Sequence, residues 1–254
     1  FGTAHRAHAS TEGVTHYFVD CAAGLFLQKE LDYLGAALAE PEKPFVAIMG
    51  GAKISGKIDV IEHLFSKVDT LLIGGGMAFT FLKVINNMEI GSSLFDAPGA
   101  DTVLAIMEKA KEKNVQIHLP EDFIAADEFS DKANCKYCTI MSGIPDGWMG
   151  LDCGLLSAAK FVEVINRAQT ILWNGPMGVF EKEKFEHSTK IVMDAVVARS
   201  QLGVVTVIGG GDTATCAKKF GTSHRVTLVS TGGGASLELL EGKVLPGVKA
   251  LNDA

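Results

Sequence analysis

The sequence predicts an α/β fold in which a six-stranded parallel sheet lies between two layers of helices. Six short apolar runs each lead into glycine or proline, and stretches with helical periodicity separate them. Strands that alternate with helices form a parallel sheet, and right-handed crossovers bring the carboxyl ends of its strands to one edge, where ligands bind. The predicted strands cover residues 45–49, 70–73, 115–119, 170–173, 204–208 and 226–229.

The composition indicates a globular protein with a large apolar core. The chain has 254 residues, of which 47% are hydrophobic, and this length suits one large or two small domains. A net charge of −7 argues against a broad nucleic-acid-binding surface. No apolar run reaches the ~18 residues of a membrane span and the N-terminus lacks a secretion signal, so we expect a soluble, non-secreted protein. Because the chain starts at Phe1 without a methionine, we expect a fragment.

The cysteines indicate reduced thiols, because five is an odd number and they are spread over a long apolar chain. Cys135 and Cys138 form a CxxC pair, but neither a second pair nor a histidine at ligand spacing accompanies them. A metal or redox role for this pair is the alternative interpretation.

The first residues carry a cluster of imidazole and guanidinium groups. His5, Arg6 and His8 lie within four residues of one another. A guanidinium can bind a phosphate or a carboxylate through two hydrogen bonds, and imidazoles suit the same anion. The alternative is a solvated terminal segment, which the composition alone favours.

A helix is expected over residues 25–39, because leucines recur there every three to four residues. Gly24 precedes this stretch, and Pro41 and Pro44 follow it, so these residues set its limits. A boundary between two domains could fall here. Helical periodicity also covers residues 57–68, 100–113, 157–168 and 188–199.

The glycine-rich stretch 204–215 is typical of a strand that runs into a helix through a phosphate-binding turn. Amides in the first turn of a helix are unpaired and carry partial positive charge, and glycines let an anion approach the main chain closely. Asp212, Thr213 and Thr215 are expected to cap the helix, and the Asp212 carboxylate also suits a Mg²⁺ ion that travels with phosphates. The alternative is a helix cap that happens to be rich in glycine.

The turn after the first strand, GGAKISGKI, holds Lys53 and Lys57 four residues apart. A helix that starts there would place both ammonium groups on one face, where they could reach neighbouring phosphates. The alternative is a solvated helix start. Lysines in a first turn oppose the helix dipole, however, and a bound anion explains them better.

The other turns suggest further parts of a nucleotide site. Small residues in GGGMAFTFLK would let a nucleobase lie against the backbone, although close packing of helix on strand explains them equally well. Asn174 could donate to a phosphate and Glu181 could accept from a ribose hydroxyl, but Glu181 is equally compatible with a surface position. Residues 148–151 are either pocket wall or core, and glycines 232–234 form a second strand-to-helix anion site.

Seven motifs follow one another along nearly the full chain: HRAHAS, GGAK with a lysine four residues on, GGGMAFTFLK, SGIPDGWMGLDCG, WNGPMGVFE, IGGGDTAT and STGGGASLELLEGKVLPG. Together they closely resemble the phosphoglycerate kinase family. The resemblance implies reversible transfer of a phosphoryl group from 1,3-bisphosphoglycerate to MgADP, which gives 3-phosphoglycerate and MgATP without a covalent enzyme intermediate.

The resemblance also implies a domain organisation, since members of this family have two α/β domains that face each other across a cleft. The chain would be a Rossmann-like nucleotide-binding domain, preceded by a fragment of a second α/β domain and a linking helix. The expected parts are the tail of the substrate domain (1–24), the interdomain helix (25–40), the nucleotide-binding domain (41–244) and a segment that returns toward the missing N-terminal domain (245–254).

The same resemblance implies roles for individual residues. Arg6 and His8 match substrate-binding residues, Lys53 matches the lysine that steadies the transferred phosphoryl group, and Asp212 would hold Mg²⁺. The expected catalytic residues are Lys53 and two glycines of the predicted anion-binding turns, Gly210 and Gly233. The expected nucleotide-binding residues are Ala52, Lys57, Gly75, Gly76, Gly150, Asn174, Pro176, Glu181, Gly209, Gly210, Gly211, Asp212 and Thr213.

The chain departs from the family pattern in three respects. Gly56 stands where the family usually carries aspartate, residues 15–24 are slightly longer than the common pattern, and most of the arginine-rich acid site is absent. We therefore expect this fragment to bind nucleotide but to be inactive without its missing domain.

The expected partners are small molecules only, ADP or ATP and the phosphoglycerates, with neither nucleic acid nor membrane. The protein is expected to be a cytoplasmic monomer, with an organellar form left open. A dinucleotide-dependent oxidoreductase is the nearest other enzyme class, although no GxGxxG motif follows the first strand. A non-catalytic nucleotide-binding module is the other alternative.

Overall fold

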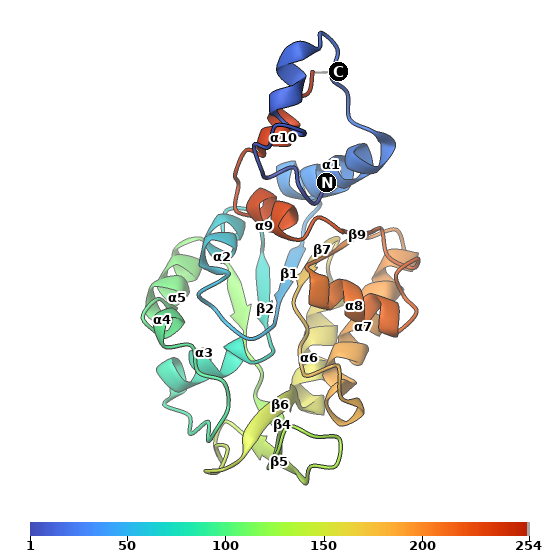
Figure 1. The fold of residues 1–254 in the computed structure, drawn as a ribbon. Coiled ribbons are helices and arrows are strands. Elements are labelled where there is room, and N and C mark those ends of the chain that lie inside the picture. The colour runs from blue at the N-terminus through green and yellow to red at the C-terminus, as the bar shows by residue number, and fades with distance from the viewer. Residues whose placement is uncertain (253–254) are drawn as a thin grey trace.

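A sheet of six parallel strands forms the centre of the computed structural model (Figure 1). The structure describes residues 1–252, without the side chains of residues 36–38. The strand order is β3-β2-β1-β7-β8-β9, and each neighbouring pair is parallel. The strands are β1 (Phe45–Met49), β2 (Thr70–Ile73), β3 (Gln116–His118), β7 (Thr170–Asn174), β8 (Val205–Gly209) and β9 (Leu228–Val229).

The central strands are apolar throughout because both faces of the sheet are covered. In β1, Phe45, Ala47 and Met49 pack into one hydrophobic cluster, while Val46 and Ile48 pack into another on the opposite face. Successive side chains of a strand point to opposite faces, so a strand between two helical layers needs an uninterrupted apolar run.

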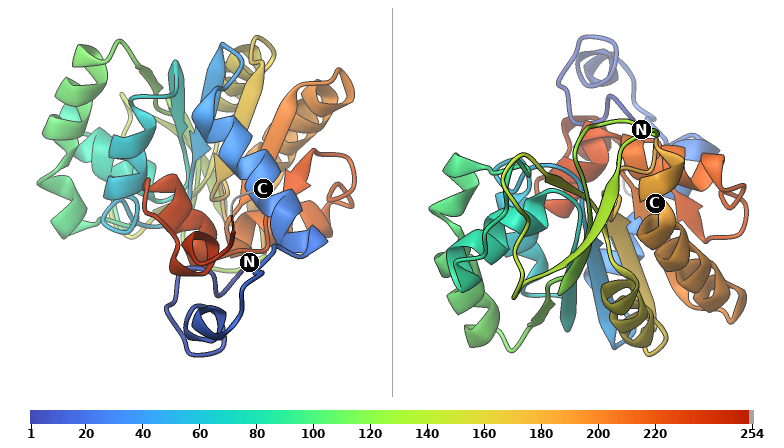
Figure 2. Two further views of the ribbon diagram at one scale, coloured as in Figure 1. Left: turned by 90° about the horizontal axis from the view of Figure 1, so that it is seen from above. Right: turned by 90° about the horizontal axis from the view of Figure 1, so that it is seen from below.

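Helices cover both faces, as the views from above and below show (Figure 2). The layer that packs on Phe45 consists of α1 (Leu25–Ala39), α2 (Ile58–Leu64), α3 (Met77–Asn86), α5 (Val103–Glu112) and α9 (Gly234–Leu240). The layer that packs on Val46 consists of α6 (Leu155–Ile165), α7 (His187–Gln201) and α8 (Gly211–Lys219). The shorter helices are η1 (Gly13–Tyr17), α4 (Ala97–Ala100), η2 (Glu183–Phe185) and α10 (Pro246–Lys249). The predicted three-layer, Rossmann-like α/β fold is confirmed.

A second, antiparallel sheet lies at the opposite end of the molecule from the two termini (Figure 1). It consists of β4 (Asp122–Ala126), β5 (Cys135–Thr139) and β6 (Met149–Cys153), in the order β5-β4-β6. The sequence pattern does not predict this sheet, because β5 reads CKYCT and is mostly exposed. Cys135 is exposed and Cys138 is buried, and both thiols are free.

The strand order reverses between β1 and β7, and this is the point where parallel sheets of this kind bind ligands. The turns that follow the two strands are in direct contact. The Gly50 amide donates to the Asn174 carbonyl oxygen at 3.0 Å, and the Gly51 amide donates to the Pro176 carbonyl oxygen at 3.0 Å. Backbone hydrogen bonds therefore hold the walls of the crevice together.

The two ends of the chain lie side by side. The Gly247 amide donates to the Ala4 carbonyl oxygen at 2.8 Å, and Leu245 is buried beside Ala4. These contacts join residues 245–252 to the N-terminal segment. The assignment of the segments to separate domains stays a prediction, and residues 253–254 of the predicted returning segment lie outside the described residues.

Candidate active site

The glycine-rich turns lie at a single edge of the main sheet. They follow β1, β2, β7, β8 and β9, and the carboxyl ends of parallel strands share one edge. The turns expected to form the site are therefore neighbours, although they are spread over residues 50–234 of the sequence.

Three of these turns pack backbone against backbone. Gly75 has a φ of +65°, and a Cβ atom there would lie 2.6 Å from the Gly51 nitrogen and 2.8 Å from the Pro176 oxygen. A Cβ atom on Gly50 would lie 2.1 Å from the same Pro176 oxygen. Glycine is required at both positions, because a side chain would force the turns apart. Gly75 packs on the neighbouring turns and also lines the pocket described below, while the nucleobase interpretation of GGGMAFTFLK stays a prediction.

Lys53 and Lys57 do not share a helical face, so that prediction is wrong. The helix α2 begins only at Ile58, because the buried Ile54 side chain and the bond from the Ser55 amide to Asp96 Oδ2 (2.7 Å) hold the chain in a loop. Lys53 is exposed on this loop, whereas Lys57 turns inward. The four-residue spacing alone could not distinguish a loop with a buried isoleucine from a helix.

The Lys57 ammonium group lies at the reversal point of the strand order. Its Nζ donates to the Gly50 oxygen at 2.6 Å, to the Asn174 carbonyl oxygen at 2.9 Å and to Asn174 Oδ1 at 2.7 Å. Burial lowers the pKa of Lys57 to about 8, and the negative charge of Asp212 opposes this shift. The group is thus a buried cation next to an acidic side chain.

Asn174 has a buried side-chain amide in which the oxygen has a hydrogen-bond partner and the nitrogen has none. Its Oδ1 accepts from Lys57, but its Nδ2 is buried without a partner. A Cβ atom built on Gly210 would lie 3.0 Å from this Nδ2, so the free donor faces the turn before α8. A buried donor without a partner is rare in proteins, and a water molecule or a ligand oxygen can supply the missing acceptor.

The helix α8 begins differently from the sequence-based prediction. Its N-cap is Gly210, with a φ of +88° and no side-chain cap, so the prediction that Asp212, Thr213 and Thr215 cap the helix is wrong. The Thr213 hydroxyl instead accepts from the Gly175 amide at 2.7 Å, and the Thr215 hydroxyl donates back to the Gly211 oxygen at 2.9 Å. The first amides of α8 are left without a side-chain cap, which suits an anion.

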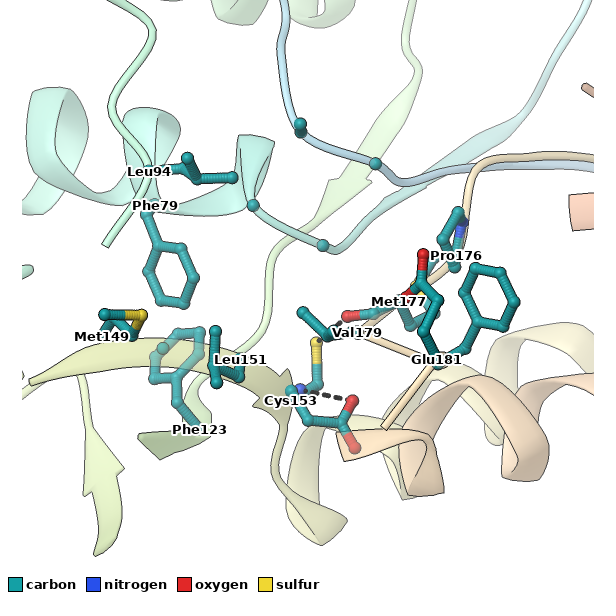
Figure 3. Close-up of a pocket in the computed structure, with 18 of the residues that line it drawn as sticks. Phe79, Leu94, Phe123, Met149, Leu151, Cys153, Pro176, Met177, Val179 and Glu181 are labelled. Carbon is teal, nitrogen blue, oxygen red and sulfur yellow. Dashed lines mark hydrogen bonds between the residues drawn. The ribbon is translucent and has the colours of Figure 1, made fainter. Parts of the chain in front are cut away.

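A cavity of about 290 Å³ lies beside these turns (Figure 3). Turn backbone lines part of its wall, and apolar side chains line most of the rest. In Figure 3, Phe79 and Leu151 lie across the cavity from Pro176 and Glu181. The predicted site residues that line it are Ala52, Gly75, Gly76, Gly150, Pro176, Glu181 and Asp212.

Several lining residues are not predicted from the sequence. Phe79 comes from α3, Phe123 from β4 and Phe129 from the loop after β4. Phe123 and Phe129 could not be assigned, because the small sheet and the loop between its strands were not expected. Within residues 148–151, the pocket interpretation holds for Met149, Gly150 and Leu151, whereas Trp148 packs against the neighbouring apolar cluster.

The end of β6 adds a buried carboxyl group and a buried thiol to the cavity lining. Asp152 Oδ2 accepts from the Ser188 amide at 3.1 Å, and Oδ1 accepts from the Cys153 amide at 2.9 Å. Burial raises the pKa of Asp152 to about 7, although these hydrogen bonds favour its charged form. Burial also raises the pKa of Cys153, so this thiol stays protonated.

Comparison with known proteins identifies the family. The family model "Phosphoglycerate kinase" matches residues 1–243. The chain belongs to the phosphoglycerate kinase family. Curated relatives include a phosphoglycerate kinase of Schistosoma mansoni, 60% identical over 100% of this chain and 61% of its own length, and one of Gallus gallus, 58% identical over 99% of this chain and 60% of its own length.

Solved structures of phosphoglycerate kinases have the same fold. The structure from Coxiella burnetii has a TM-score of 0.93 and 42% identity, and it covers 98% of this chain and 63% of its own length. The structure from Pyrococcus horikoshii OT3 has a TM-score of 0.82 and 28% identity, and it covers 98% of this chain and 62% of its own length. The chain thus spans about three fifths of the length of the phosphoglycerate kinases that it matches.

Ten residues expected from the family resemblance lie outside the lining of the described cavity: Arg6, His8, Lys53, Lys57, Asn174, Gly209, Gly210, Gly211, Thr213 and Gly233. Arg6 and His8 are exposed in the N-terminal segment. Gly233 is the N-cap of α9, with a φ of +53°. The N-terminal segment lies against this turn, since a Cβ atom on Gly234 would be 3.1 Å from His5 Nε2. Arg6 and His8 therefore belong to a segment that contacts the turn before α9.

Within residues 1–252, no group of three or more His, Cys, Asp or Glu side chains is arranged to hold a metal ion. Asp212 lines the cavity, as do Asp152 and Glu181, but these residues do not form such a group. As for membranes, none of the helices that the structure describes is both long and apolar enough to span one.

Proposed function

We propose that this chain is the nucleotide-binding part of a phosphoglycerate kinase. The complete enzyme would transfer a phosphoryl group reversibly from 1,3-bisphosphoglycerate to MgADP and so form 3-phosphoglycerate and MgATP. The observation that carries the proposal is the unpartnered Asn174 Nδ2, which is buried and faces Gly210 at the edge of the sheet. A phosphate oxygen is the acceptor that this donor lacks.

The cavity lining would bind the two ends of a nucleotide differently. The apolar wall around Phe79 and Leu151 and the bare backbone of Gly75 suit the faces of a nucleobase. The exposed Glu181 carboxylate at the wall suits ribose hydroxyl groups. The phosphates would then extend toward Asn174 and the uncapped amides of α8.

The residues present also fit Mg²⁺. This ion usually binds one or two protein carboxylates together with substrate phosphates, and Asp212 supplies one carboxylate beside the amides of α8. Bound with the nucleotide, Mg²⁺ would neutralise phosphate charge.

The remaining chemistry of phosphoryl transfer consists of positioning and charge stabilisation. The Lys57 ammonium group would exchange part of its present oxygen partners for nucleotide phosphate. Lys53 is exposed on its loop and would steady the transferred phosphoryl group. Because neither lysine needs to form a covalent bond, the reaction requires no nucleophilic side chain.

Isothermal titration calorimetry with MgADP tests the proposal. We expect Asn174→Asp to weaken MgADP binding at least tenfold, since it replaces the free donor with a charged acceptor. Asn166→Asp introduces the same charge at the opposite edge of the sheet, just after α6, and should bind as the wild type does. A folded wild-type protein, verified by circular dichroism, that binds no MgADP would overturn the proposal. Equal affinities for the two variants would reject the role of Asn174.

We also infer that the protein is a monomer of the cytoplasm, which the family resemblance supports. Sedimentation velocity and cell fractionation test these two points separately.

A further inference from the structure

The loop between β4 and β5, residues 127–134, lies at the mouth of the cavity. Phe129 lines the cavity, yet its side chain is 58% exposed. A large apolar ring that is half covered and faces a cavity is suited to contact a ligand there. What holds this ring in place is therefore important for binding.

The base of the loop is held by its own contacts. The Asn134 amide nitrogen donates to Asp127 Oδ1 at 2.9 Å, and Asn134 Nδ2 donates to Asp127 Oδ2 at 2.7 Å. Ala133 is buried against Leu151 and Phe185. These contacts fix the two ends of the loop but do not reach its tip, where Phe129 and Asp131 lie.

The tip is held from another part of the chain. Lys182 Nζ lies 3.4 Å from Asp131 Oδ2 and 5.7 Å from the centroid of the Phe129 ring. Two residues further on, Lys184 Nζ donates to the Ala133 oxygen at 2.8 Å. The Lys182 side chain is only 28% exposed, which is unusual for a lysine at the surface and shows that it lies along the loop.

The two lysines belong to the segment that carries Glu181, one of the acidic residues that line the cavity. A single short segment thus contributes a carboxylate to the cavity and, through Lys182, contacts the aromatic ring at its mouth. An isolated exposed ion pair contributes little, but here a cation–π contact and a backbone hydrogen bond act on the same loop.

We propose that Lys182 and Lys184 are positioning residues that hold the 127–134 loop so that Phe129 closes over the base end of a bound nucleotide. The inference rests on the proposed function and assigns to these lysines a role in nucleotide affinity. Lys182 acts through Phe129 and Asp131, and Lys184 acts through the loop backbone.

Binding of two ligands to three variants tests the inference. Lys182→Met and Lys184→Met remove the charge and keep most of the side-chain length, while Lys190→Met does the same at an exposed site on α7. The ligands are MgADP and magnesium pyrophosphate, which lacks the base and ribose. We expect Lys182→Met to weaken MgADP binding about three- to tenfold through faster dissociation, with a smaller effect of Lys184→Met. Pyrophosphate binding and the control should be unchanged.

A double-mutant cycle between Lys182→Met and Phe129→Leu measures whether the two side chains act together. Non-additive losses of MgADP affinity support the inference. Additive losses, unchanged MgADP affinity in Lys182→Met, or equal losses for MgADP and pyrophosphate would each overturn it. Wild-type protein that binds no MgADP would instead overturn the proposed function itself, so the two failures are distinguishable.

Discussion

The Lys57 ammonium group donates hydrogen bonds within the protein, to the Gly50 oxygen and to two oxygens of Asn174. Its charge is nevertheless costly, because burial removes water from it and lowers its pKa from 10.5 to about 8. The negative charge of Asp212 offsets only part of this cost. A buried ammonium group that is already bonded to the turns stabilises them and keeps a cation close to the cavity.

The shifted pKa of Lys57 predicts a pH dependence of stability. Between pH 8 and 10.5 the unfolded chain holds this proton while the folded protein has lost it, so the contribution of Lys57 to the free energy of unfolding rises with pH across this window. The total change is on the order of 3 kcal/mol. Urea unfolding of wild type and Lys57→Ala at several pH values checks this, because other titrating groups cancel in the difference. A difference that stays constant from pH 8 to 10.5 contradicts the prediction.

At the scale of elements, the turns after β1, β2 and β7 make close backbone contacts with one another. Their backbones touch at Gly50, Gly75 and Pro176, so the cavity wall formed there has a fixed position. Backbone contacts thus hold the glycines of these turns in place at the edge of the sheet where ligands bind in sheets of this kind.

This packing predicts a large effect of Gly75→Ala. The new Cβ atom would meet backbone atoms of Gly51 and Pro176, and the positive φ would add strain, so we expect a loss of about 2–5 kcal/mol in the free energy of unfolding and weaker MgADP binding. Gly56→Ala is the matched control, since a Cβ atom there meets nothing within 4 Å. Denaturant unfolding compares the two variants, and equal stabilities would show that the turns can separate at little cost.

The sequence predicts some elements better than others for physical reasons. Strands such as β1 and β7 are recognisable because burial on both faces demands continuous apolar runs that end in glycine turns. The small sheet escapes detection, since β5 is mostly exposed and β6 contains Gly150 and Asp152. Glycines of the site follow from the turns, but the aromatic lining depends on that small sheet and could not be inferred.

The directions of the side chains also could not be predicted from the sequence pattern. The spacing of Lys53 and Lys57 fits a helix, but their segment is a loop in which Ile54 is buried. The two lysines therefore have different surroundings. Likewise, nothing in the sequence indicates that Thr213 would bond the Gly175 amide rather than cap its own helix. Both outcomes depend on contacts between distant segments.

At the scale of the whole molecule, the chain spans about three fifths of the length of its phosphoglycerate kinase relatives. The residues that line the cavity lie between Gly51 and Asp212, while Arg6 and His8 are exposed in a segment that lies against the last glycine turn. Binding of nucleotide and turnover of substrate should therefore be separable properties.

We accordingly predict that this chain alone binds MgADP but produces no ATP from 1,3-bisphosphoglycerate. A version extended with the N-terminal portion of a relative should restore turnover, because domain closure is expected to exclude water and to complete the substrate site. A coupled assay that follows ATP formation compares the two proteins. Turnover by the present chain alone would contradict the prediction, and nucleotide binding without turnover in the extended protein would favour a non-catalytic module.

The direct contact of backbones at Gly50, Gly75 and Pro176 restricts how this site can change in evolution or in the laboratory. Substitutions in those turns would destabilise the fold before they changed the ligand specificity. Variation is left to the opposite wall, where the side chains of Phe79, Met149 and Leu151 lie outside the backbone contacts at Gly50, Gly75 and Pro176. A designer who wants to change the base specificity proposed for this protein should therefore randomise that wall and leave the glycine turns unchanged.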